Sequence, residues 1–184
     1  MNRLRALGAA AAFAAVLAVT GSGVAQQSDR DPALERSSQL AAAPASASAD
    51  AAIGAEKARS VAADVARSIP LPSGGTFDGV RWEEAGGVFT ADEIAFVLQY
   101  NATCQWLRAW RDGRNASVTA RVLVQVPSWP VWRGSEEGAK VIAGVVGDVR
   151  AGGGAWAQAM LADCDASRER EVRYAAAKGL TATR

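Results

Sequence analysis

Histidine is missing from this chain of 184 residues, and only two of its residues are cysteines. Without an imidazole the chain cannot form a Ser-His-Asp triad, a Cys-His pair or an HExxH zinc site. Two cysteines alone cannot supply the four ligands of a structural zinc site. We therefore expect no metal and no cofactor, and carboxylates are the remaining raw material for catalysis.

An excess of charge of one sign is also absent, because 20 basic residues are balanced by 19 acidic ones and the formal net charge is +1. The basic residues are interspersed with the acidic ones along the chain. A nucleic-acid-binding domain normally gathers its basic residues on one face. The sequence therefore predicts no nucleic-acid partner.

The longest apolar run stands at the N-terminus. Arg3 and Arg5 precede apolar residues 6–20, and small residues follow up to Ala25. This order is typical of a secretory signal peptide over 1–25. The alternative is an uncleaved single-pass membrane anchor, because 6–25 is about as long as a bilayer-spanning helix. Either segment would place the rest of the chain outside the cytoplasm, secreted or in the cell envelope. The abundance of Ala and Gly is typical of proteins from GC-rich bacteria.

Large apolar residues are scarce over 26–49, where Leu34 and Leu40 stand among Ala, Ser and Pro. Such a stretch buries too little surface to offset the entropy lost on ordering. We therefore predict a disordered linker over 26–49, followed by a single domain over 50–180.

The stretch 90–113 carries helix signals at both ends. Thr90 and Glu93 match the capping-box pattern T-x-x-E, and Gly113 is a typical stop. The apolar residues between them recur at helical spacing and cover more than one stripe: Phe96, Val97, Tyr100, Cys104, Trp106, Leu107 and Trp110. A helix with so wide an apolar face is expected at the centre of the domain.

Helical spacing and caps predict the other elements, while the glycines and prolines of 71–88 predict an extended loop. The further predicted helices are 51–68 capped by Asp50, 115–126, a helix after Ser135, 155–164, and 166–178 capped by Asp165. The stretch 115–126 also alternates as a strand does, and we assign it to a helix because no other stretch offers a partner strand. The expected fold is thus an all-α domain of four to six helices.

The two cysteines, Cys104 and Cys164, both fall on apolar stretches of predicted helices. Export would place both thiols in an oxidising compartment. We predict a disulfide between them, with a pair of buried free thiols as the alternative.

Six tryptophans are many for a chain of this length. Aromatic surfaces flanked by arginines bind sugar rings, peptides and anionic polymers. The candidate binding surface comprises Trp106, Trp110, Trp129, Trp132, Arg108, Arg111 and Arg133. For the tryptophans the sequence nevertheless favours the plainer interpretation, that the same rings fill the core of a small helical domain.

Carboxylates occur as three adjacent pairs, Glu83–Glu84, Asp92–Glu93 and Glu136–Glu137. Glycoside hydrolysis needs two carboxyl groups that converge from about 5 to 9.5 Å apart. Neighbours on a helix point about 100° apart and do not converge. The sequence therefore favours an exported, non-enzymatic protein that binds an envelope protein or polymer through the aromatic and arginine surface. A carboxylate-dependent cell-wall hydrolase is the alternative.

Overall fold

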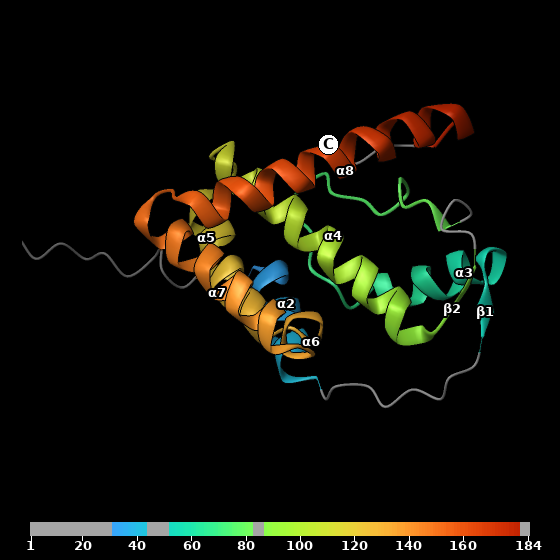
Figure 1. Cartoon of the computed structure of the whole chain (residues 1–184), viewed down its shortest axis with the longest axis horizontal. Coiled ribbons are helices and arrows are strands. Elements are labelled where there is room, and N and C mark those ends of the chain that lie inside the picture. The colour runs from blue at the N-terminus through green and yellow to red at the C-terminus, as the bar shows by residue number, and fades with distance from the viewer. Residues whose placement is uncertain (1–30, 44–51, 83–86, 181–184) are drawn as a thin grey trace, which may run out of the picture.

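The computed structural model describes residues 31–43, 52–82 and 87–180, and this part of the chain is mostly helical (Figure 1). Its helices of ten residues or more are α2 (Pro32–Ala42), α3 (Ala55–Ala66), α4 (Ala91–Arg111), α5 (Ala116–Gln125), α7 (Glu136–Ala151) and α8 (Ala155–Lys178). The short elements are η2 (Val126–Ser128), α6 (Pro130–Arg133), β1 (Ile53–Gly54) and β2 (Val88–Phe89). The predicted all-α fold class is confirmed. The predicted signal peptide over 1–25 lies outside the described residues.

Helix α4 is the central element, as predicted. Its capping box is formed, because Thr90 Oγ1 accepts from the Glu93 amide at 3.1 Å while the Thr90 amide donates to Glu93 Oε2 at 2.7 Å. Every residue from 101 to 109 is buried, since α4 packs against α3, α5, α6 and α8. In Figure 1, α8 runs above α4, with α5 and α7 at one end and α3 with the β1–β2 pair at the other.

Helix α5 settles the ambiguity between strand and helix at 115–126 in favour of the helix. Asn115 stands at its N-cap in a left-handed conformation, with φ 43°, and its side chain makes no capping hydrogen bond. The predicted cap of the next long helix is present, because Ser135 Oγ accepts from the Gly138 amide at 2.9 Å at the start of α7. The predicted helix over 115–126 and the predicted helix start at Ser135 are therefore confirmed.

Helix α2 corrects the predicted linker, because residues 32–42 were expected to be disordered. Asp31 Oδ1 accepts from the Ala33 amide at 2.8 Å, and Pro32 occupies the first helical position, where it needs no N–H partner. Leu34 and Leu40, each 7% exposed, pack against α5 and η2. Two leucines suffice here because α5 and η2 supply the other side of the apolar contact. The rest of 26–49 lies outside the described residues.

Two further boundaries differ from the prediction. The expected helices 155–164 and 166–178 are one helix, α8, and Asp165 lies inside it rather than capping a new helix. Helix α3 begins at Ala55 rather than at 51, because Ile53 and Gly54 pair in antiparallel register with Phe89 and Val88. The described part of the predicted loop, 71–82, is irregular, and it lies against α4 and α8.

Candidate functional site

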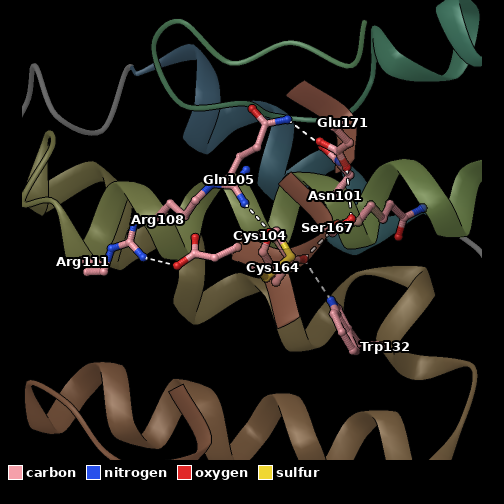
Figure 2. Close-up of a disulfide and its surroundings, with 12 residues drawn as sticks. Asn101, Cys104, Gln105, Arg108, Arg111, Trp132, Cys164, Ser167 and Glu171 are labelled. Atoms are coloured by element: carbon pink, nitrogen blue, oxygen red, sulfur yellow. Dashed lines mark hydrogen bonds and ion pairs between the residues drawn. A yellow bond between two sulfur atoms is a disulfide. The ribbon is translucent and has the colours of Figure 1, made fainter. Parts of the chain in front are cut away.

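The predicted disulfide between Cys104 of α4 and Cys164 of α8 is present, with a Cα–Cα distance of 5.3 Å (Figure 2). Both residues are buried, at 3% and 0% exposure. The bond joins the central helix to the C-terminal helix across a sequence separation of 60. Its burial is typical of a structural rather than a reactive disulfide.

On one side of the disulfide, the contact between α4 and α8 is polar. Asn101 Nδ2 donates to Glu171 Oε1 at 2.7 Å, and Gln105 Nε2 donates to Asn101 Oδ1 at 2.8 Å (Figure 2). Ser167 Oγ also donates to Glu171 Oε1, at 3.3 Å. Glu171 is only 7% exposed, so these bonds offset part of the cost of burying its carboxylate. They also fix the register of α8 on α4, because each donor must meet its acceptor.

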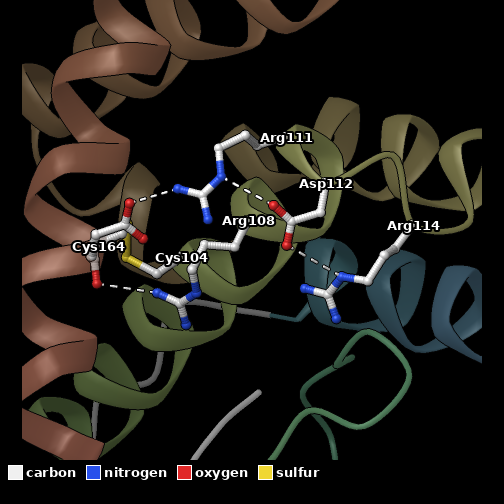
Figure 3. A network of polar contacts seen from close by, with 7 residues as sticks. Cys104, Arg108, Arg111, Asp112, Arg114 and Cys164 are labelled. Carbon is white, nitrogen blue, oxygen red and sulfur yellow. Dashed lines mark hydrogen bonds and ion pairs between the residues drawn. A yellow bond between two sulfur atoms is a disulfide. The ribbon is translucent and has the colours of Figure 1, made fainter.

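On the other side of the disulfide lie two arginines of the predicted binding surface. Arg108 is 2% exposed and its Nη1 donates to the Cys164 carbonyl at 3.1 Å (Figure 3). Burial lowers the pKa of Arg108, against the opposing attraction of Glu171. Arg108 is therefore not available to an external partner, and its inclusion in the predicted surface is wrong.

Arg111 is exposed and belongs to a network of ion pairs. Its Nη1 lies 2.6 Å from Asp165 Oδ2, and its Nε lies 3.1 Å from Asp112 Oδ1 (Figure 3). Partial burial alone would lower the pKa of Arg111, but hydrogen bonds to Asp112 and Asp165 raise it above its ordinary value. The charge of Arg111 thus links α8 to the end of α4.

Three tryptophans of the predicted surface are in the core instead. Trp106, Trp129 and Trp132 are 2%, 0% and 6% exposed. Each indole N–H has a buried acceptor, namely the Pro70 carbonyl at 2.9 Å, Ser37 Oγ at 3.2 Å and Thr103 Oγ1 at 3.2 Å, respectively. These three rings do not belong to a binding surface, and the favoured interpretation that they fill the core is confirmed. Because these rings are buried and their N–H groups are hydrogen-bonded, they form no exposed surface for a protein or polymer partner.

The other two members of the predicted surface are not brought together. Trp110 is half-buried and packs against the core near the end of α4. Arg133 is exposed, and its Nη2 donates to the Ala43 carbonyl at 2.6 Å after the end of α2. The seven predicted residues therefore do not form one surface.

A pocket that the sequence did not predict opens between α4, α8, residues 80–82 and Phe89, and we call it the aromatic pocket. Its volume is about 220 Å³. Its aromatic lining consists of Trp82, Phe89, Phe96 and Tyr100, and its polar lining consists of Arg81, Asn101, Ser167 and Glu171. Trp82 and Phe89 pack edge to face at 5.5 Å, and Phe96 stacks on Tyr100 at 6.4 Å. Phe96 is 52% exposed, so an aromatic ring stands at the opening.

The described carboxylates do not form a converging pair at this pocket. Glu171 is the single carboxylate among its described lining residues. Glu93 is held in the capping box, and Glu136 and Glu137 are exposed in the first turn of α7. The pair Glu83–Glu84 lies outside the described residues. In the described ranges there is also no cluster of three metal-ligating side chains, and no helix there is long and apolar enough to span a membrane.

Tyr100 gives the pocket a measurable pH signature. Burial, and to a lesser extent the charge of Asp163, raise the pKa of the Tyr100 hydroxyl above 10.0. A raised pKa in the folded state contributes stability that is present below the unfolded pKa and is lost as pH rises through the folded pKa. We therefore expect the urea midpoint to fall as pH rises above about 10 and Tyr100→Phe to reduce that fall, because the variant has no hydroxyl to ionise. An equal fall in both proteins would contradict the burial of this hydroxyl.

Comparisons with protein-family models, with curated proteins and with solved structures find no match to this chain, so the geometry of the site carries the functional argument.

Proposed function

We propose that this chain is an exported, non-enzymatic protein, secreted or held in the bacterial envelope, that binds an envelope protein or polymer through the aromatic pocket. The observation that carries the proposal is a pocket walled by four aromatic rings, with Arg81 and Glu171 among its polar groups. Aromatic rings and arginine are the residue types that the sequence predicted for binding, here at a different place in the fold. The signal-like segment over 1–25 and the disulfide support export.

The size of the pocket indicates the kind of occupant. Its volume of about 220 Å³ is below the range of roughly 300 to 1,000 Å³ of sites that enclose a whole small molecule. It fits one side chain or one sugar ring that a larger partner presents. Phe96 at the opening of the pocket and Val88 beside it, which are 52% and 66% exposed, offer further apolar contact. A partner that reaches both would bury apolar side chains that are now partly in water.

The hydrolase is the weaker candidate. A retaining or inverting mechanism needs a second carboxyl group opposite the first, and the described lining of the pocket supplies Glu171 alone. Glu171 also accepts hydrogen bonds from Asn101 and Ser167, which explains its position without catalysis. We expect purified protein to release no product from cell-wall preparations. Hydrolysis that Glu171→Gln abolishes would favour the enzyme instead.

Site-specific photocrosslinking in the native host tests the binding role. A photoreactive residue replaces Val88, which is exposed beside the pocket, and a second protein carries it in place of Val124, which is 39% exposed on α5. We expect a discrete adduct from position 88 and none of that size from position 124. Phe96→Ser should reduce the adduct several-fold, because it removes an exposed contact ring without disturbing the core.

Two results would reject the proposal. One is an adduct that forms equally well from position 124, since a specific partner must be located at the pocket. The other is an adduct from position 88 that Phe96→Ser leaves unchanged. Equal circular dichroism and urea midpoints for the variants serve as the control for folding.

A further inference from the structure

We propose that a second cavity, formed by α2, the turn between α4 and α5, and residues 71–73, binds a small molecule that carries a phosphate or carboxylate on a ring or apolar body. Its volume is about 410 Å³, within the range of sites that enclose a whole small ligand. It shares no lining residue with the aromatic pocket. This site goes beyond the proposed function and does not depend on it.

Two guanidinium groups from separate elements line this cavity, and we call it the arginine cavity. Arg36 comes from α2, and within the described part of the chain it makes no ion pair or hydrogen bond. Arg114 comes from the turn after α4 and has a single, long ion pair with Asp112, at 3.6 Å. The planar N–H donors of arginine match the two oxygens of a carboxylate or phosphate. The cavity therefore holds unused donors of the type that recognises an oxyanion.

The single carboxylate among the described lining residues of the arginine cavity already accepts a helix-capping hydrogen bond. It belongs to Asp31, whose Oδ1 accepts from the Ala33 amide at 2.8 Å as the cap of α2. The described lining thus carries two guanidinium groups against one carboxylate, which leaves one positive charge in excess. The start of α5, which no side chain caps, adds to the positive potential beside Asn115.

The neutral groups of the arginine cavity indicate the body of the ligand. Ser73 and Asn115 line the cavity, and neither side chain has a hydrogen-bond partner among the described residues. Leu71, Pro72 and Val118 give the cavity apolar lining, whereas Trp106, which is 2% exposed, contributes little surface to it. An apolar body can lie against this lining while its anionic group meets the arginines and its polar substituents meet the Ser73 hydroxyl and the Asn115 carboxamide.

Isothermal titration of the purified protein tests the assignment, with phenyl phosphate and benzoate as the two anionic probes and phenol as the neutral probe. We expect saturable binding of at least one anionic probe with a Kd of about 1 mM or tighter, and no detectable binding of phenol. Arg36→Gln and Arg114→Gln should each weaken binding about tenfold, as expected when one charge-assisted hydrogen bond is lost. Arg150→Gln, at an exposed arginine in the last turn of α7, is the charge-matched control and should bind as the wild type does.

Inorganic phosphate adds a probe without a ring and should bind at least several-fold more weakly than phenyl phosphate. Whichever of phenyl phosphate and benzoate binds more tightly identifies the anion that the site prefers. Absence of binding by both, equal binding of phenol, or equal affinity in Arg36→Gln, Arg114→Gln and Arg150→Gln would overturn the proposal. If an arginine variant fails to fold, the comparison of phenyl phosphate with phenol on the wild-type protein still decides.

Discussion

Removal of the disulfide by the double change Cys104→Ala and Cys164→Ala is expected to lower the free energy of unfolding by about 4 kcal/mol. The bond closes a loop with a sequence separation of 60, and the chain-entropy model gives about this value for such a loop as an upper figure. The total free energy of unfolding of a domain of this size is roughly 5 to 15 kcal/mol. The variant should therefore be marginally stable, with α8 released first because much of its contact with α4 is polar.

Urea unfolding of the oxidised wild type and of the double variant measures this loss. The single change Arg111→Gln is a useful control, since it removes an exposed ion pair between the same two helices and should cost less than about 1 kcal/mol. A double variant that unfolds at the same urea concentration as the wild type would show that the noncovalent contacts alone hold α8 in place.

The change Trp129→Ala is expected to lower the free energy of unfolding by about 3 to 5 kcal/mol. Trp129 is fully buried, and its Nε1 donates to Ser37 Oγ at 3.2 Å. Its loss opens a cavity and leaves the buried Ser37 hydroxyl without this donor. Because Ser37 lies in α2, which packs on η2 and α5, the variant should also expose α2 to protease.

Trp156→Ala is the matched control for this prediction. Trp156 is 46% exposed and lies over Gly144 of α7. The change Trp156→Ala should lower the free energy of unfolding by less than about 1 kcal/mol, because removal of a half-exposed ring leaves no enclosed cavity. Limited proteolysis and urea unfolding of both variants check the pair. Equal losses in the two variants would contradict the assignment of Trp129 to the core.

The sequence alone was sufficient to predict a helix where its capping residues lie close to one another in the chain. The capping box of Thr90 and Glu93 marks α4, and Ser135 marks α7, because both caps are formed by residues close in sequence. The disulfide was also predictable from two cysteines on apolar helical stretches of an exported chain. Asp31 and Pro32 carry the same kind of local signal at the start of α2, but the linker was predicted from the low apolar content of 26–49 alone.

Long-range partners decided what the sequence could not predict. Asp165 resembled a helix cap, yet it lies within α8 and pairs with Arg111, which is 54 residues away. The sequence did not show whether the tryptophan rings face the core or the solvent. The acceptors of their indole N–H groups lie 29 to 92 residues away in the chain. The aromatic pocket likewise combines residues of α4 and α8 with Trp82 and Phe89. Only the stacking of Phe96 on Tyr100, four residues apart on α4, had a local signal.

Hydrogen–deuterium exchange of the purified, oxidised protein tests the central claim, that the aromatic pocket is the binding site, most directly. The exchange is measured with and without solubilised envelope from the native host. The claim predicts slower exchange over 87–100 and 167–171, which border the pocket, and unchanged exchange over α5, whose residues do not line it. Slower exchange confined to α5 or α7, or no change anywhere in the chain, would contradict it.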